Sequence, residues 1–482
     1  MTNLLWPGEH RAGEHMTDAA LLDAMVAVES AWLAALTGAG LAPADCAAAD
    51  LRNLVADNDF ETLAVGAEDG GNPVIGLVRL LRERADPAVA PWIHRGLTSQ
   101  DVLDTTLMLG VRALADDLIA ELREQIRVLS ALTDRHRATP MVARTLTQHA
   151  APTTFGGKAA GWLNGVIDAF DNVIALVTPV QIGGAAGTLA ASTELAALRT
   201  GTADPAAVSV ELARCTAAAL GLAPRPPWHT ARAPITAAAD ALVGCTDSWG
   251  RIAADVVTLA RPEIGELGEP ATATRGGSSS MPHKRNPVLS ILIRRAAIAG
   301  PPLAATLHTA AALAGDERPD GAWHAEWDTL RILGRRTAVA ASQCTELLAG
   351  LSVHTARMAE NLAAADVLGE QRAIAELAGG APSPTYFGAV DRVIDETLRR
   401  AARGASRAVS DPASQSATAI SMDRHSPRAC AAAQSPPRTA RSSSSTSGLS
   451  APRSASHADT VAVIWWAGTR ATCPRCSRSV SW

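Results

Sequence analysis

Hydrophobic residues recur at three- and four-residue intervals over much of the first 350 residues, which is the spacing of one helical face. The clearest stretch is 99–137, which contains no proline and a single glycine, Gly110. Its regularly spaced apolar residues are Leu103, Leu107, Val111, Leu114, Leu118, Leu122 and Ile126. The pattern predicts one unbroken helix that is longer than globular norms and typical of a helical bundle.

The same spacing predicts further helices. One begins after Thr17, a residue type that accepts a hydrogen bond from a first helical turn, and ends near Gly38. Four others are long, at 154–178, 233–261, 287–314 and 323–351. Helices of this length build a bundle about 40 Å long, because each residue adds about 1.5 Å. We therefore predict an all-α protein with an N-terminal helical domain (1–95), a central long-helix bundle (96–350) and a C-terminal helical domain (351–403).

Two segments break the pattern. Residues 265–287 are rich in Gly, Ser and Pro, cannot be helical throughout, and predict a long loop of the kind that forms lids in enzymes. Residues 404–482 contain no Lys or Glu, and Ser, Arg, Ala and Pro crowd together there. That composition is typical of a disordered tail, or of a GC-rich coding sequence read out of frame. We assign this tail no chemistry.

Composition supports helices and narrows the possible partners. Aromatic residues make up only 3% of the chain, and runs of β-branched residues are scarce. A net charge of −5 leaves no basic stripe for nucleic acid. No apolar run reaches the length of a membrane span and the N-terminus is polar, so we expect a cytoplasmic protein. Cys473 and Cys476 form a lone C-x-x-C, which is weak support for a metal, and we predict no metal site.

The predicted loop carries the strongest candidate chemistry. Residues 275–287 read R-G-G-S-S-S-M-P-H-K-R-N-P, and Lys284 is one of only two lysines in the chain. Glycines let backbone approach a ligand closely, serines supply hydroxyls, and Lys284 with Arg285 supplies positive charge. The combination suits an anionic substrate. It lacks the G-x-x-x-x-G-K-[ST] arrangement of a nucleotide-binding loop.

Three segments together resemble the signature regions of the fumarase/aspartase superfamily. These are 277–287, 92–105 and 144–156, which agree with the superfamily in order and spacing. The resemblance covers about residues 5 to 400. It implies a three-part helical fold, a homotetramer in which three subunits contribute to each site, a small polycarboxylate substrate, and no metal or organic cofactor.

The resemblance also implies roles for individual residues. Ser278 is the residue that exchanges a proton on the carbon next to a carboxylate, and its alkoxide requires stabilisation by loop amides and cations in a closed site. We expect His149 to lie on a segment that leads into a helix, and to act there as an acid or as a hydrogen-bonding residue. The residues expected to bind substrate are His94, Thr98, Ser99, Gln148, Arg275, Lys284, Asn286 and Arg318.

Leu146 distinguishes between branches of the superfamily. Fumarase, argininosuccinate lyase and adenylosuccinate lyase carry a histidine at this position, after the Arg-Thr pair or its equivalent. Leucine cannot transfer a proton, so the leaving group has to be weakly basic, as a carboxylate is. Segments 179–187 and 321–327 resemble carboxymuconate cycloisomerases as well. The resemblance therefore implies lactonisation of 3-carboxy-cis,cis-muconate to 4-carboxymuconolactone, a step of protocatechuate catabolism, through an enediolate.

Two alternatives stay open. One is an elimination like that of adenylosuccinate lyase, which releases fumarate; the M-P-H-K-R-N-P string is shared with that group, although Leu146 argues against it. The other is an inactive structural tetramer, for which the relevant feature is that the chain departs from the superfamily pattern after about residue 404.

Overall fold

A computed structural model describes residues 3–56, 58–270, 272, 275–278, 280–281 and 283–407. This part of the chain is 65% helical, and its four strands are short, so the prediction of an all-α fold is confirmed. The predicted tail at 404–482 falls almost wholly outside the described residues; only its first four residues are described, as the end of a helix. The domain boundaries remain a prediction.

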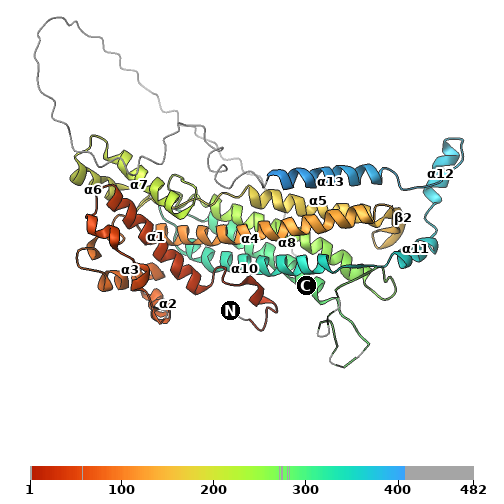
Figure 1. Cartoon of the computed structure of the whole chain (residues 1–482), viewed down its shortest axis with the longest axis horizontal. Helices are drawn as coiled ribbons and strands as arrows, with labels where there is room; N and C mark the ends of the chain where they lie inside the picture. The colour runs from red at the N-terminus through yellow and green to blue at the C-terminus, as the bar shows by residue number, and fades with distance from the viewer. Residues whose placement is uncertain are drawn as a thin grey trace, which may run out of the picture. The chain divides into compact units, whose positions relative to one another are not determined.

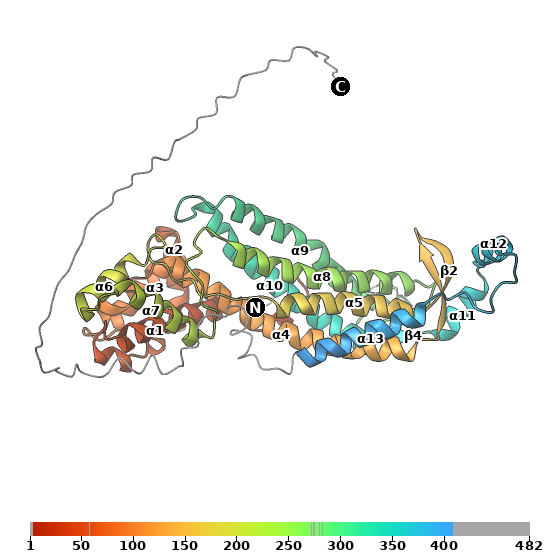
Figure 2. The ribbon, with the colours of Figure 1, turned by 90° about the horizontal axis from the view of Figure 1, so that it is seen from above.

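Five long helices form the central bundle (Figures 1 and 2). Helix α9 packs on α8 and α10, and α4 packs on α5 and α10. Each begins and ends within four residues of its predicted bounds. The five are α4 (Ser99–Arg135), α5 (Phe155–Ile174), α8 (Ala233–Leu259), α9 (Val288–Ala312) and α10 (Gly321–Ala349).

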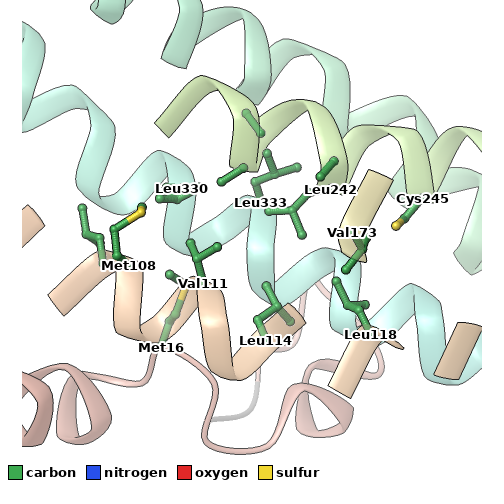
Figure 3. Packing of buried hydrophobic residues seen from close by; sticks show 14 of the residues in the cluster. Met16, Met108, Val111, Leu114, Leu118, Val173, Leu242, Cys245, Leu330 and Leu333 are labelled. Atoms are coloured by element: carbon green, nitrogen blue, oxygen red, sulfur yellow. The ribbon is translucent and has the colours of Figure 1, made fainter. Parts of the chain in front are cut away.

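The bundle core is built from the apolar face that the sequence pattern predicts. Val111, Leu114 and Leu118 on α4 are almost fully buried. They pack close to residues of α8 and α10 (Figure 3), among them Leu242, Leu330 and Leu333. Close packing of such side chains holds the helices in one register, which fixes the positions of polar groups at the helix ends.

A second group of helices surrounds the start of α4. Helix α1 begins after Thr17, whose hydroxyl accepts a hydrogen bond from the amide of Ala20, and it packs against α4 and α7. The helices of this region are α1 (Asp18–Gly38), α2 (Asp59–Gly70), α3 (Pro73–Arg84), α6 (Ala190–Thr200) and α7 (Pro205–Leu220). The short 3-10 helices are η1 (Glu9–Ala12), η2 (Ala44–Ala48), η3 (Arg52–Leu54) and η4 (Ala90–Trp92).

A hairpin of two antiparallel strands follows α4, where we expected a segment leading into a helix. His149 lies in its second strand, β2, which leads directly into α5, so this expectation is confirmed, whereas the hairpin itself was not predicted. The turn places Leu146 and Thr147 at φ 47° and 71°, a conformation that favours glycine or asparagine. Neither residue type is present, so the sequence carries no turn signal. The strands are β1 (Pro140–Thr145) and β2 (Gln148–Thr154).

The remaining elements lie near the hairpin or along the bundle. Strands β3 (Leu267–Gly268) and β4 (Ser352–Val353) pair antiparallel, and α13 packs on α5. The last helices are α11 (Thr355–Ala363), α12 (Gly369–Leu377) and α13 (Val390–Arg407). Apart from β3, the described residues between α8 and α9 contain no helix or strand, in agreement with the predicted long loop.

Two helices, α1 and α9, are long and apolar enough to cross a membrane by length and composition alone. Both are packed as bundle helices, α1 against α4 and α7, and α9 against α8 and α10. Core helices of soluble proteins pass the same test, so this feature is weak support for a membrane span. A cytoplasmic location stays a prediction.

Candidate active site

The start of α4 carries Thr98 and Ser99, two of the residues expected to bind substrate. Thr98 is the N-cap of the helix, and its amide donates to Oδ2 of Asp101 at 3.0 Å. Asp101 is fully buried and also accepts hydrogen bonds from the amides of Gly183 and Gly184, both at 2.9 Å. This carboxylate therefore fixes both the first turn of α4 and the loop at 179–187.

His229 completes this cluster. Its Nε2 lies 3.0 Å from Oδ1 of Asp101, and the side chain is buried. A Cβ atom at Gly183 would lie 2.7 Å from the His229 ring, so the close approach of loop and histidine requires glycine there. The segment that resembles cycloisomerases at 179–187 thus has a structural role at the start of α4.

A second buried network lies one turn further along α4. Arg232 donates to Asp104 at 2.6 Å and also pairs with Glu326 of α10, and all three side chains are buried. Trp323 donates from Nε1 to Asp104 at 3.0 Å. Segment 321–327 therefore joins α10 to α4 through this network.

The pKa values of Arg232 and Glu326 in this network are both raised, which favours the charged form of the arginine and disfavours the charged form of the carboxylate. Burial alone would lower the pKa of Arg232, but the carboxylates of Asp104 and Glu326 raise it above its ordinary value. Burial raises the pKa of Glu326, and the hydrogen bonds and charge of Arg232 only partly offset this. The arginine is thus a fixed cation among carboxylates, and its geometry is set by the fold.

His94 and Arg318 lie at the same end of α4. His94 Nδ1 is 2.6 Å from Oε1 of the buried Glu29, and its side chain lines a cavity together with Ser99. The guanidinium of Arg318 lies over the ring of Trp323 at 5.6 Å. Four of the expected site residues, His94, Thr98, Ser99 and Arg318, are therefore grouped around the start of α4.

The hairpin carries Gln148 and His149 at the other end of α4. Helix α4 has 37 residues, which corresponds to a length of about 54 Å. Gln148 and His149 are exposed, and Leu146 at the tip is 95% exposed. One chain cannot bring the hairpin and the start of α4 to a single small-molecule site.

The long loop between α8 and α9 begins close to this hairpin. Arg144 of β1 forms two hydrogen bonds to the buried carboxylate of Glu266, at 3.0 and 2.8 Å. Glu269, also near the start of the loop, accepts from the amides of Leu289 and Ser290 in the first turn of α9, at the other end of the loop. Two carboxylates near the start of the loop thus anchor it, one to the hairpin and the other to α9.

Within the loop, Ser278 Oγ accepts hydrogen bonds from two backbone amides. The donors are Met281 at 3.1 Å and Ser280 at 3.4 Å. A hydrogen bond joins the two ends of segment 276–286, because the amide of Asn286 donates to the carbonyl of Gly276 at 2.8 Å. Gly276 has a φ of 79°. Two N–H donors aimed at one hydroxyl oxygen would stabilise negative charge on that oxygen.

Arg275 and Lys284 differ in their contacts. Arg275 pairs with Glu346 of α10 at 2.6 Å, and Arg11 pairs with the same carboxylate at 2.6 Å. Burial would raise the pKa of Glu346, but hydrogen bonds from Arg11 and Arg275 lower it below its ordinary value. Lys284 is exposed, and the structure records no ion pair for it among the described residues. Arg275 thus joins the loop to the bundle, while Lys284 has a charge available for an anion.

The expected site residues therefore fall into two groups within one chain. The loop and hairpin hold Ser278, His149, Gln148, Arg275, Lys284 and Asn286, and the start of α4 holds the other four. Among the described residues no hydrogen bond joins Ser278 to the hairpin, and no group of three or more His, Cys, Asp or Glu side chains is arranged to hold a metal ion.

The sequence reasoning missed the buried polar residues that support the start of α4. A signal existed for one of them. Glu29 lies on the apolar stripe of α1, four residues after Met25 and three before Trp32, where a charged side chain needs a partner. The partner could not be named, because it lies 65 residues away in sequence. The missed residues are Glu29, Asp101, Asp104, His229, Arg232 and Glu326.

Comparison with known proteins gives consistent matches. Residues 14–299 match the sequence model of a protein family that is described as a lyase family. Nitrosuccinate lyase of Streptomyces davaonensis is 46% identical over 355 residues, which cover 72% of this chain and 73% of that protein. A 3-carboxy-cis,cis-muconate cycloisomerase of Pseudomonas aeruginosa is 38% identical over 355 residues, 72% of this chain and 74% of that protein.

Solved structures agree with these sequence matches. The crystal structure of 3-carboxy-cis,cis-muconate lactonizing enzyme from Pseudomonas putida superimposes with a TM-score of 0.67 at 31% identity. The match covers 82% of this chain and 86% of that one. The resemblance on three short segments thus extends over most of the fold.

Proposed function

Because this chain belongs to the lyase family of the fumarase/aspartase superfamily, we propose that it eliminates a weakly basic anion from a polycarboxylate, or adds one in reverse. Ser278 exchanges the proton on the neighbouring carbon. The observation that carries this proposal is the hairpin tip, where Leu146 stands in place of the proton donor that related lyases carry. A leaving group that departs without protonation makes such a donor unnecessary.

The primary substrate we propose is nitrosuccinate, because the nitrosuccinate lyase match has 46% identity over 72% of the chain. Ser278 removes a proton from the methylene carbon, and the electron pair is delocalised into the adjacent carboxylate. The pair then forms the carbon–carbon double bond as nitrite leaves with the electrons of the carbon–nitrogen bond. The products are fumarate and nitrite. Nitrite is a weak base, as a carboxylate is, so Leu146 suits this reaction.

The second candidate is the lactonisation of 3-carboxy-cis,cis-muconate, which the match to the P. aeruginosa cycloisomerase and the P. putida structure favour. Here one carboxylate attacks the conjugated alkene, and Ser278 delivers a proton to carbon to give 4-carboxymuconolactone. The reverse reaction expels a carboxylate. Both candidates therefore use the same proton carrier and require no acid for the leaving group.

The support for Ser278 is that its oxygen accepts hydrogen bonds from two amides, those of Ser280 and Met281. A serine hydroxyl is a weak base, so its alkoxide needs electrostatic stabilisation before it can remove a proton from carbon. Amides of the loop supply part of this stabilisation. Lys284 is an exposed cation of the loop whose charge is available for a substrate carboxylate, and Asn286 lies two residues further along the chain.

We further propose that the site is completed by assembly of several chains, as in a homotetramer. The start of α4 and the hairpin are about 54 Å apart along the helix, too far for one substrate. Ile291 and Ile298 of α9 are 49% and 71% exposed, and such apolar positions on a bundle helix are typical of a subunit interface. In such an assembly, the start of α4 in one chain can face the loop and the hairpin of other chains.

The test is an assay of the purified protein with four substrates. Nitrosuccinate is followed by nitrite and fumarate, 3-carboxy-cis,cis-muconate by loss of its ultraviolet absorbance, and adenylosuccinate and argininosuccinate by fumarate. We expect equimolar nitrite and fumarate from nitrosuccinate. Turnover of carboxymuconate alone selects the second candidate. Efficient release of fumarate from adenylosuccinate or argininosuccinate contradicts the leaving-group argument, and a folded oligomer that turns over none of the four selects a structural protein.

A further inference from the structure

The backbone at His94 is held in a strained conformation. Its φ is 59°, in the left-handed region that residues other than glycine rarely adopt. Arg82 of α3 donates from Nη2 to the carbonyl of Ile93 at 2.8 Å, and Trp32 of α1 donates from Nε1 to the carbonyl of Arg95 at 2.8 Å. Side chains from two helices therefore hold the peptide groups on both sides of His94. Strain that is held in this way is typical of functional positions.

A third contact fixes the imidazole ring itself. Oε1 of Glu29 lies 2.6 Å from Nδ1 of His94, and the Glu29 side chain is fully buried. The other oxygen, Oε2, is buried and has no hydrogen-bond partner among the described residues. A buried carboxylate with a single partner strongly favours a proton on that partner, so Nδ1 donates to Glu29. Nε2 then lies on the opposite side of the ring, and no hydrogen bond to it is recorded among the described residues.

His94 lines a cavity of about 510 Å³ between α3 and the start of α4. The charged residues around it are Arg79, Arg82 and Glu83 of α3, so the lining carries a positive excess before His94 is counted. Ser99 of α4 adds a hydroxyl. Arg79 is exposed, and no partner is recorded for it in the part of the chain that the structure describes. The volume and the charge suit one end of a small dicarboxylate.

We propose that Glu29 is a positioning residue of the active site, whose buried carboxylate holds His94 so that Nε2 faces this cavity and, in the imidazolium form that donates from both ring nitrogens, binds a substrate carboxylate. The inference rests on the proposed function, because it takes the cavity as the carboxylate end of that substrate site. Glu29 itself does not touch the substrate. Carboxylates that bind metal-bound and catalytic histidines act in the same way. They fix which ring nitrogen donates to the carboxylate and how the ring is oriented.

The test is chemical labelling of histidine, which needs no turnover. Diethyl pyrocarbonate modifies unprotonated imidazole, and trypsin releases residues 85–95 as a peptide in which His94 is the single histidine. In Glu29→Gln we expect the His94 modification rate at pH 6 to rise at least about threefold, because the buried carboxylate no longer holds Nδ1 and the ring is free to present either nitrogen to the reagent. Succinate at millimolar concentration is expected to protect His94 in the wild-type protein and to lose at least half of that protection in Glu29→Gln.

Asp117→Asn is the matched control. Asp117 pairs with His15 at 2.7 Å, so this change removes a carboxylate from another histidine, away from the His94 cavity. It should leave the labelling and the protection of His94 unchanged. If Glu29→Gln does not fold, Glu29→Asp keeps the charge and withdraws it by one methylene, and we expect an intermediate labelling rate. Thermal unfolding followed by circular dichroism identifies which variants fold.

Kinetics separate a positioning role from a structural one. With whichever substrate the protein turns over, Glu29→Gln should raise KM about tenfold while kcat changes less than about threefold, because ground-state binding of a carboxylate is lost. His94 labelling and succinate protection that are the same in Glu29→Gln and wild type overturn the inference. A protein that is labelled and protected as expected but turns over none of the four substrates contradicts the proposed reaction and leaves the histidine geometry in place.

Discussion

The start of α4 and the loop between α8 and α9 differ in how they hold polar side chains. At the start of α4, Asp101, Asp104 and Arg232 are buried and bind groups from other helices and loops. In the loop, the hydroxyl of Ser278 is bound by amides only two and three residues away. The first region receives its geometry from the whole fold. The second region is held by local contacts, and we expect the substrate and other chains to supply the remaining contacts.

The electrostatic environments differ in the same way. Charges buried at the start of α4 interact strongly because little water screens them, so losing one partner is costly. Ser278 is half-buried and Lys284 is exposed within one chain. The chemistry that we propose for them requires a closed, water-poor site, which assembly and substrate binding would supply. Variants in the two regions should therefore separate stability from turnover.

The largest effect is expected for Ser278→Ala. Loss of the proton-carrying hydroxyl should lower turnover at least about a thousandfold, with the unfolding midpoint unchanged because its hydrogen bonds are local. Steady-state assays and urea unfolding measure the two quantities. Ser352→Ala on β4 is a matched change at an exposed serine outside the site. Near-normal turnover of Ser278→Ala would remove the loop from the chemistry.

Asp101→Asn should have the reverse effect of Ser278→Ala, with a larger effect on stability than on turnover. Asp101 accepts from two glycine amides and His229, and an asparagine amide group in its place would face donors. We expect the free energy of unfolding to fall by about 2–4 kcal/mol. Urea denaturation measures this loss. A change below about 0.5 kcal/mol, typical of a surface position, would show that the start of α4 is not held by this network.

Arg275→Met tests whether Arg275 joins the loop to the bundle or binds substrate. Because Arg275 pairs with Glu346, Arg275→Met and Glu346→Gln should each lower kcat/KM by about tenfold, and the double variant should be no worse than either. A much larger loss in Arg275→Met than in Glu346→Gln would assign Arg275 to the substrate instead.

The pH dependence of this contact follows from the lowered pKa of Glu346. A carboxyl group whose folded-state pKa lies below its unfolded value stabilises at pH above the unfolded value, and this stabilisation is lost as pH falls through the folded value. The contact between loop and bundle should therefore persist from about pH 5 upward and weaken below about pH 4. Limited proteolysis of the loop across this range is the measurement.

The smallest effect is expected for Leu146→His. The side chain is 95% exposed at the hairpin tip, so the fold tolerates the change. If the leaving group needs no proton, the added histidine should leave kcat/KM within about threefold of wild type. An increase of tenfold or more in fumarate release would mean that an acid was missing, and would contradict the proposed class of leaving group.

The sequence predicted the long helices well because a helix of 20 residues or more repeats its apolar spacing many times. The bounds of α4 and α10 agree with the pattern to within two residues. The short hairpin at 140–154 was missed because two strands of six and seven residues offer little repetition, and its turn uses Leu146 and Thr147. Local signals are weak where an element is short and its conformation is imposed by neighbours.

For the candidate site, the sequence by itself determined which segments we propose to carry the chemistry. The composition of 275–287 indicates an anion-binding loop, and Leu146 indicates a missing proton donor, because both are properties of residue types along the chain. Only the tertiary structure decided what holds these residues. Glu29 with His94, Asp101 with His229, and Arg275 with Glu346 are pairs 65 to 128 residues apart. Which buried charge meets which partner depends on how the helices pack, and no local pattern records it.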